Sequence, residues 1–441
     1  MTRRLFGTDG VRGVAGEFLT AELALALGQA ATRNTGVQRP QVLIVRDTRE
    51  SGEMLQAAIA AGVSAAGGDA LLGGVLPTPA APLLIHRYGF DLAVVLSASH
   101  NPYQDNGIKF FAGDGYKLSD ESELAIEREL DATRQTSGRV KAIGRIRELR
   151  GAPEDYLREL HVRFRELDLT GVDVLLDCAN GATYLLAPEI FRRLGADVSV
   201  IADAPDGRNI NAGCGSTHVD ALARAVIEGK HALGFAFDGD GDRVLAVDRL
   251  GGVVDGDELL ALATLHLRAS ARLSGNGVVV TVMTNYGFHA AMEREHVDVA
   301  TTQVGDRYVL EELRARGWTL GGEQSGHLID MGFNRTGDGI ASALLTLEAL
   351  GGRDLSERDA MAKLPQRLVN VRVRDRDALA HAQEVDAAVH SAEQALAGRG
   401  RVLVRPSGTE PLVRVMVEAP TDAEAEQVCA SLVALVEREL G

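Results

Sequence analysis

Short apolar runs rich in β-branched residues alternate with longer amphipathic stretches through most of the chain. Strand-like runs occupy 42–45, 92–96, 172–177 and 277–283, and the helix-like stretches that follow them occupy 54–66, 121–132, 185–194 and 288–293. Such alternation predicts parallel or mixed sheets with helices on their faces. The tail differs, with strand-like runs at 367–373, 401–405 and 412–418 and helical stretches at 378–397 and 423–440. It predicts a separate α+β module.

The length of the chain supports several domains rather than one. With 441 residues, three or four domains can each bury a core of their own. Glycine, proline and charged residues cluster near 150, 250 and 365. We therefore predict three related α/β domains at 1–150, 151–250 and 251–365, followed by an α+β domain at 366–441.

Composition excludes several classes of function. The net charge of -16 and the pI of about 5.2 disfavour binding to nucleic acid or to an anionic membrane surface. The first ten residues contain no signal-peptide core, and no apolar run approaches the roughly 18 residues of a membrane span. The three cysteines, Cys178, Cys214 and Cys429, form no metal-binding or disulfide pattern. We expect a soluble cytoplasmic protein.

The most specific local feature is the acidic loop Asp238-Gly-Asp240-Gly-Asp242-Arg243, directly after the apolar run 233–237. Three carboxylates on alternate residues can converge on one hard cation, since the glycines between them leave the backbone free to turn. An EF-hand would need Gly and Glu where this loop has Arg243 and Arg249. The loop therefore predicts a Mg²⁺ site, which normally completes its coordination with water or a phosphate oxygen.

A candidate phosphoryl carrier follows the run 92–96. The segment Ser97-Ala-Ser99-His100-Asn-Pro offers two hydroxyls at a strand end, and a serine beside polar donors can act as a nucleophile. The residues alone do not choose between Ser97 and Ser99. Lys109, further along, could reach the same pocket.

Three loops have the composition of small-ligand sites. Segment 321–327, Gly-Gly-Glu-Gln-Ser-Gly-His, combines an acceptor, an amide, a hydroxyl and an imidazole. Segment 405–411, Arg-Pro-Ser-Gly-Thr-Glu-Pro, with Arg414 beyond it, offers guanidiniums, hydroxyls and loop amides for a phosphate monoester. It lacks the Gly-Lys-Ser/Thr ending of a Walker A loop. Segment 7–13, Gly-Thr-Asp-Gly-Val-Arg-Gly, is a weaker anion-binding candidate.

Four of these motifs occur in the order found in α-D-phosphohexomutases, and the chain resembles that family over essentially its whole length. They are SASHNP, DGDGDR, GEQSGH and RPSGTEP, one in each predicted domain. The resemblance implies four domains around a central cleft. It selects Ser99 as the phosphoserine, and it implies one Mg²⁺ per subunit held by Asp238, Asp240, Asp242 and the phosphate on Ser99.

The resemblance also implies roles for the remaining candidate residues. Glu323 and Ser325, with His327, would hold the sugar. The sugar's own phosphate would bind Arg405, Ser407, Gly408, Thr409 and Arg414. Arg12, Arg243 and Lys109 would stabilise the transferring phosphoryl group, and His100, Lys109 and His327 stay open as the general base. A bisphosphorylated sugar would be intermediate and primer, and a homodimer is expected.

Short segments indicate the sugar. FGTDGVRG at the start, Asn209-Ile-Asn211 with the following 214–218, Gly305-Asp-Arg-Tyr-Val and Gln324 resemble family members that act on amino-sugar phosphates. We therefore predict interconversion of glucosamine 6-phosphate and glucosamine 1-phosphate. Three alternatives stay open: the same chemistry on mannose or glucose phosphate, a metal-dependent phosphatase, and a silent phosphosugar sensor.

Overall fold

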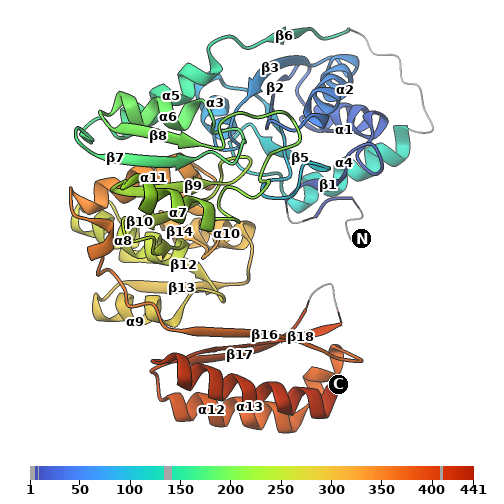
Figure 1. Cartoon of the computed structure of the whole chain (residues 1–441). Helices are drawn as coiled ribbons and strands as arrows, with labels where there is room; N and C mark the ends of the chain where they lie inside the picture. Colours follow the sequence, from blue (N-terminus) through green and yellow to red (C-terminus); the bar gives the residue numbers. More distant parts are fainter. Residues whose placement is uncertain (1–4, 8, 134–141, 408–410) are drawn as a thin grey trace. The chain divides into compact units, whose positions relative to one another are not determined.

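The computed structural model describes residues 5–7, 9–133, 142–407 and 411–441, which form two compact units (Figure 1). The first unit contains Met1–Val282 and Val299–Arg358, and the second contains Met283–Asp298 and Asp359–Gly441. Each unit is described by itself below.

The first sheet of the first unit has six strands in the order β1-β5-β4-β2-β3-β6. Its strands are β1 (Val11–Val14), β2 (Gln41–Arg46), β3 (Asp69–Val75), β4 (Leu92–Leu96), β5 (Asp105–Ala112) and β6 (Ile146–Glu148). The four from β4 to β6 in this order run parallel, while β5 is antiparallel to both β4 and β1. The run Leu92–Leu96 is buried on both faces, as a central strand between helical layers requires.

Four helices lie between β1 and β6 in the chain, and a fifth follows β6. They are α1 (Ala21–Asn34), α2 (Ser51–Ala65), α3 (Ala80–Tyr88), α4 (Asp120–Thr133) and α5 (Ala152–Arg163). Helix α1 packs against α2 and α4, and α3 packs against α5. The side chain of Thr20 accepts a hydrogen bond from the backbone N–H of Leu23 and caps α1. The core of this domain includes Leu27, Ile44, Ile59 and Val94.

The second sheet has the order β11-β10-β9-β7-β8. Its strands are β7 (Asp173–Asp177), β8 (Asp197–Ile201), β9 (Leu233–Phe237), β10 (Val244–Asp248) and β11 (Val253–Val254), and its helices are α6 (Leu186–Arg193) and α7 (Asp220–Gly229). Strand β7 runs parallel to β8 and β9, whereas β10 returns antiparallel to β9. The acidic loop 238–243 is the connection between β9 and β10.

The third sheet has the order β13-β12-β14-β15. Its strands are β12 (Gly277–Thr281), β13 (Asp298–Thr302), β14 (Leu320–Gly322) and β15 (Leu328–Asp330), with helices α8 (Gly256–Ala269), α10 (Asp306–Arg316) and α11 (Gly339–Leu350). Asp255 and Glu258 form a capping box at the start of α8. Helix α8 contacts both β10 and β14, so it links the second and third sheets. Short 3₁₀ turns occupy Ser274–Asn276 and Leu355–Glu357.

The second unit contains a three-stranded antiparallel sheet in the order β16-β18-β17 (Figure 1). Its elements are α9 (Tyr286–Arg294), β16 (Gln366–Arg372), a 3₁₀ turn at Asp377–His381, α12 (Gln383–Leu396), β17 (Arg401–Pro406), β18 (Leu412–Glu418) and α13 (Asp422–Leu440). Helices α12 and α13 pack together against the sheet around Val415, Cys429 and Val436.

The predicted fold class is confirmed: three domains with mixed sheets precede a C-terminal domain with a small antiparallel sheet. The central cleft predicted from the resemblance would involve both units, which are described separately here, so it stays a prediction. Cys178, Cys214 and Cys429 are free and buried. None of the helices in the described part of the chain has the length and apolar character needed to cross a bilayer.

Candidate active site

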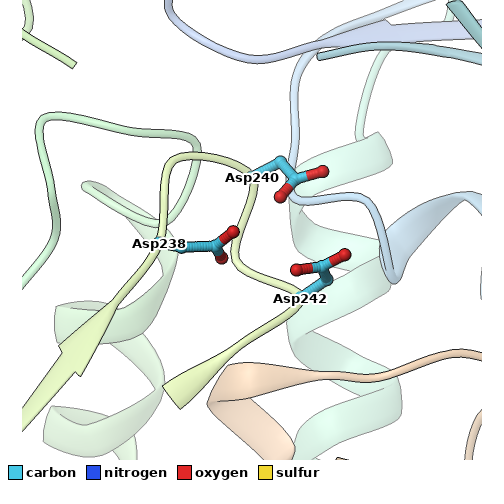
Figure 2. A group of neighbouring side chains, drawn as sticks. All are labelled: Asp238, Asp240 and Asp242. Atoms are coloured by element: carbon cyan, nitrogen blue, oxygen red, sulfur yellow. The ribbon is translucent and has the colours of Figure 1, made fainter. Parts of the chain in front are cut away.

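Three buried carboxylates converge in the loop between β9 and β10 (Figure 2). One ligand oxygen from each of Asp238, Asp240 and Asp242 lies within 4.8 Å of the others. Gly241 has a φ of +68°, a left-handed conformation that glycine adopts without steric cost. Gly239 lies where a side chain would collide with the Ser99 carbonyl oxygen. The alternating glycines thus allow the tight turn that brings the acids together.

The oxygens of this triad fit a cation. The Oδ1 atoms of Asp240 and Asp242 are buried and accept no hydrogen bond from the described residues. Burial first, and then the charges of Asp242 and Asp240, hold the pKa of Asp238 well above its ordinary value. Clustered anionic oxygens of this kind are stable when a hard divalent ion lies among them. The triad is therefore a candidate metal site.

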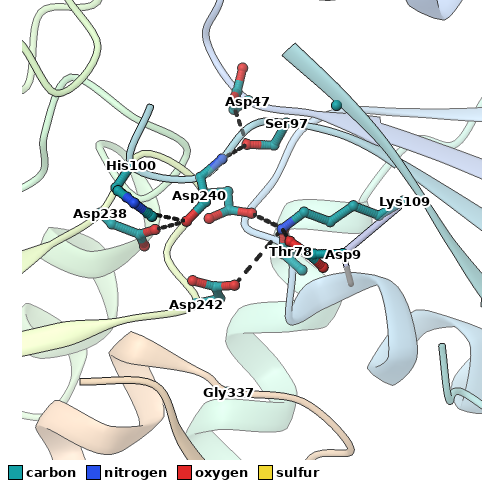
Figure 3. Close-up of polar contacts among 12 residues, drawn as sticks. Asp9, Asp47, Thr78, Ser97, His100, Lys109, Asp238, Asp240, Asp242 and Gly337 are labelled. Carbon is teal, nitrogen blue, oxygen red and sulfur yellow. Dashed lines mark hydrogen bonds and ion pairs between the residues drawn. The ribbon is translucent and has the colours of Figure 1, made fainter. Parts of the chain in front are cut away.

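Ser99 comes from the first sheet and reaches the triad of the second, where Figure 3 shows His100 beside Asp238. It lies three residues beyond β4, is buried, and has a φ of 52°. Its Oγ donates a hydrogen bond of 2.5 Å to Oδ2 of Asp238, and Nδ1 of His100 lies 3.4 Å from the same Oγ. Burial, followed by the charge of Arg243, lowers the pKa of His100 to about 4. A neutral imidazole and a carboxylate therefore both contact the Ser99 hydroxyl.

Ser97 has a different position from Ser99. Its Oγ donates to Oδ2 of Asp47 at 2.5 Å and accepts the N–H of Ser99 at 3.0 Å. The hydroxyl of Ser97 is thus bonded to Asp47, beyond β2, and to the Ser99 N–H, rather than to the triad.

Lys109 lies within the acidic cluster. Its Nζ is 2.8 Å from Oδ2 of Asp240, 3.0 Å from Oδ2 of Asp9 and 3.8 Å from Oδ2 of Asp242, and the residue is 1% exposed. Burial alone would lower the pKa of Lys109, but these carboxylates raise it above its ordinary value. Lys109 is therefore a fixed positive charge, which suits charge stabilisation better than proton abstraction.

The two arginines predicted for this site also contact its acids. Arg12 pairs with Asp9, and the backbone N–H of Arg243 donates to Oδ1 of Asp238 at 3.2 Å. The guanidinium of Arg243 lies 3.8 Å from Oδ1 of Asp242. Burial by itself raises the pKa of Asp9, but Lys109, Lys117 and Arg12 together hold it well below its ordinary value.

The predicted sugar loop connects β14 to β15. Oε1 of Glu323 accepts the N–H of Gly305 at 3.0 Å, and Nδ1 of His327 lies 3.6 Å from Oδ2 of Asp242. Burial lowers the pKa of His327, but the Asp242 carboxylate raises it above its ordinary value. Ser325 lies in the same turn, between β14 and β15. His327 therefore connects the sugar loop with the acidic triad.

The predicted phosphate loop belongs to the second unit. Arg405 in β17 is directly opposite Arg414 in β18, and burial together with Arg414 lowers the pKa of Arg405. The N–H of Ser407 donates to the Leu412 carbonyl at 2.8 Å. Two facing guanidiniums form an anion-binding arrangement. Gly408 and Thr409 lie outside the described residues.

Several residues around the site were missed from the sequence. The buried Asp47–Arg49 pair, with 2.8 Å between Oδ2 and Nε, lies behind the Ser99 loop. Thr78 donates to Oδ2 of Asp240 at 2.6 Å, and Lys117 bridges Asp9 and Asp306. The charged stretch Arg46-Asp-Thr-Arg49 at the end of a buried strand was a usable signal. Isolated Thr78 offered none.

Family models match four successive parts of the chain. Three alpha/beta/alpha domain models of phosphoglucomutase/phosphomannomutase, I, II and III, match residues 3–137, 154–251 and 255–368, and the C-terminal domain model matches 368–435. The four matches follow the order of the four motifs in the sequence.

Solved structures have the same fold. A phosphoglucomutase/phosphomannomutase family protein from Burkholderia thailandensis gives a TM-score of 0.82 at 22% identity, covering 100% of this chain and 98% of that chain. N-acetylphosphoglucosamine mutase of Aspergillus fumigatus, solved with GlcNAc-6P and magnesium, gives 0.66 at 19% identity, covering 100% and 96%. At these identities the likeness concerns the fold alone.

Curated relatives extend over nearly the whole chain. The phosphoglucosamine mutase of Moorella thermoacetica is 50% identical over 436 residues, covering 97% of this chain and 98% of the relative. That of Bacillus subtilis is 47% identical over 445 residues, covering 99% of each. Because the models and these relatives together span the chain, it belongs to the phosphoglucomutase/phosphomannomutase family and is a phosphohexomutase, an isomerase.

Proposed function

We propose that the protein is a phosphoglucosamine mutase, interconverting glucosamine 6-phosphate and glucosamine 1-phosphate through phosphoserine at Ser99 and a bisphosphorylated sugar. The observation that carries the proposal is the 2.5 Å hydrogen bond from Ser99 Oγ to Asp238, which joins a hydroxyl of one domain to the acidic triad of another. Full-length relatives of that name at 46–50% identity support the choice of reaction.

We propose that the triad holds one Mg²⁺ per subunit. Asp238, Asp240 and Asp242 would be its protein ligands, together with an oxygen of the phosphate on Ser99. When bound, the ion would offset the negative charge of the phosphoserine and favour departure of the serine oxygen.

The chain's own residues would bind and orient the sugar phosphate. Arg405, Ser407, Gly408, Thr409 and Arg414 would bind the phosphate already on the sugar, and Glu323, Ser325 and His327 would hold its hydroxyls. The free hydroxyl would attack phosphorus as the bond to Ser99 Oγ breaks. The hydroxyl proton would pass to a general base of the site, and the departing serine oxygen would take up a proton. The bisphosphate would then reorient in the site so that its other phosphate faces Ser99. The second transfer would return that phosphoryl group to Ser99.

Charge on the transferring group would be stabilised by Arg12, Arg243 and Lys109. His100 is the neutral imidazole beside Ser99 Oγ, which favours it over Lys109 for accepting the serine proton in the return step. Domain limits of 1–150, 151–250, 251–365 and 366–441, a homodimer and a cytoplasmic location are also parts of this proposal.

Sugar preference tests the proposal. With Mg²⁺ and a trace of sugar bisphosphate, kcat/KM for glucosamine 6-phosphate is expected to exceed that for glucose or mannose 6-phosphate by at least about tenfold. The reason is that Glu323, a buried carboxylate proposed to contact the sugar, would bind the ammonium of glucosamine more strongly than the hydroxyl of glucose or mannose. A preference for glucose or mannose phosphate would keep the mechanism and overturn the sugar. Release of inorganic phosphate without isomerisation would favour a phosphatase instead.

Metal binding has a readout that does not depend on activity. Mg²⁺ at about 100 times its Kd is expected to stabilise the protein by about 2.7 kcal/mol, measured as a higher melting temperature. Asp240→Asn should abolish most of this shift, because it removes a charged ligand oxygen that accepts no hydrogen bond from the described residues. The exposed Asp197→Asn is the matched control. An equal shift in both variants would rule out the triad as the binding site.

A further inference from the structure

Asn211 reaches the loop that carries Ser99 from the neighbouring domain. Its Nδ2 donates hydrogen bonds to the main-chain oxygens of Ser99, at 2.9 Å, and of Asn101, at 3.1 Å. The residue is 6% exposed. Segment 209–211 follows β8 and belongs to the domain of the second sheet, so this amide crosses from one domain to the other.

The same two oxygens receive a second donor from inside the first domain. Nη2 of Arg49 lies 2.9 Å from the Ser99 oxygen and 2.8 Å from the Asn101 oxygen. Asp47 holds Arg49 through its Nε. Ser99 has a φ of 52°, which is uncommon for a residue with a side chain. The two donors together stabilise that conformation.

Asn211 is in turn attached to the acidic loop. The backbone N–H of Asn211 donates to the Ala179 carbonyl at 2.9 Å. Three residues after Ala179, the N–H of Ala182 donates to the carbonyl of Gly239, in the acidic loop, at 2.8 Å. A side chain at Gly239 would come within 2.6 Å of the Ser99 oxygen and 2.7 Å of Asn211 Nδ2. The Ser99 loop, the Asn211 amide and the acidic loop therefore meet with no spare space.

We propose that Asn211 is a positioning residue for phosphoryl transfer: its amide sets the Ser99 loop against the acidic loop, so that Ser99 Oγ lies at Asp238. The inference rests on the proposed role of Ser99. A side-chain amide is suited to this position because one NH₂ group has two hydrogens for two carbonyl oxygens. A carboxylate has none, so an aspartate of the same shape would face both oxygens in repulsion.

The test is a pair of variants at Asn211. Asn211→Asp is expected to lower kcat by about 10²-fold, since a displacement of about 1 Å in a reacting group has an effect of this size. Asn211→Ala, which loses the bonds without repulsion, is expected to lower kcat by roughly tenfold. KM for the sugar phosphate should stay near the parent value in both variants, because Asn211 is not among the residues proposed to bind the substrate. Single-turnover transfer from phosphorylated Ser99 should slow by the same factors.

Asn209→Asp is the matched control. Asn209 lies in the same segment, but its amide donates to the Ala204 carbonyl rather than to the Ser99 loop, so kcat should change little. Equal losses at Asn209 and Asn211, or a change confined to KM, would overturn the positioning role. Thermal melts identify unfolding, and Asn211→Ala keeps the test informative if the aspartate variant does not fold. A parent protein without isomerase activity would instead refute the proposed function.

Discussion

Ser99→Ala is expected to lower kcat by roughly 10⁴-fold or more, because it removes the atom to which the phosphoryl group would be attached. Labelled bisphosphate should no longer transfer its label to the protein. Folding should be retained, because the change deletes only one hydroxyl. Its partner, Asp238, still accepts a hydrogen bond from the backbone N–H of Arg243 at 3.2 Å. The measurement is isomerisation of glucosamine 6-phosphate together with label incorporation.

Two other serines serve as comparisons for this variant. Ser431→Ala, at an exposed position in α13, should behave as the parent. Ser97→Ala should keep label incorporation but slow turnover, because the Ser97 hydroxyl supports the Ser99 N–H. Full incorporation in Ser99→Ala, lost in Ser97→Ala, would move the carrier to Ser97.

Lys109→Met is expected to lower the free energy of unfolding by about 3–5 kcal/mol, the range for removing one partner of a buried ion pair. Nζ of Lys109 lies within 3.0 Å of oxygens of both Asp240 and Asp9, and their charges would be left uncompensated. Urea denaturation in EDTA measures the loss without a cation to offset these acids. Lys230→Met, at an exposed position, is the control and should change stability little.

A second substitution tests whether charge is the cause. Adding Asp240→Asn to Lys109→Met should restore part of the lost stability, since it removes one of the unpaired carboxylates. If the double variant is less stable than Lys109→Met by the full effect of Asp240→Asn alone, the two residues are uncoupled and packing rather than charge explains the loss.

Local elements were predictable because they depend on local properties. The run Leu92–Leu96 was predicted as a strand from its β-branched residues and is β4, and the helical stretch 121–132 falls within α4, Asp120–Thr133. The acidic loop was identified in the same way, since three carboxylates and two glycines in five residues already imply a shared cation. Four motifs in order were sufficient to indicate the family.

Pairing between distant residues was not predictable, because it depends on how separate sheets meet. The residues alone left Ser97 and Ser99 open, and the structure separates them: Ser97 bonds to Asp47, while Ser99 reaches Asp238. Asn211 and Arg49 converge on the same two carbonyl oxygens from positions far apart in the chain.

The sequence by itself determined the fold class, the order of the domains, the acidic loop and the family, because these follow from periodicity and from short contiguous patterns. Only the tertiary structure decided which hydroxyl meets the acids, how Lys109 is charged and what holds the Ser99 loop. The physical reason is that hydrogen bonds and pKa values depend on distances of a few ångströms and on burial. Both are set when the loops that follow β4 and β9, in two different sheets, come together, and no local sequence pattern specifies that contact.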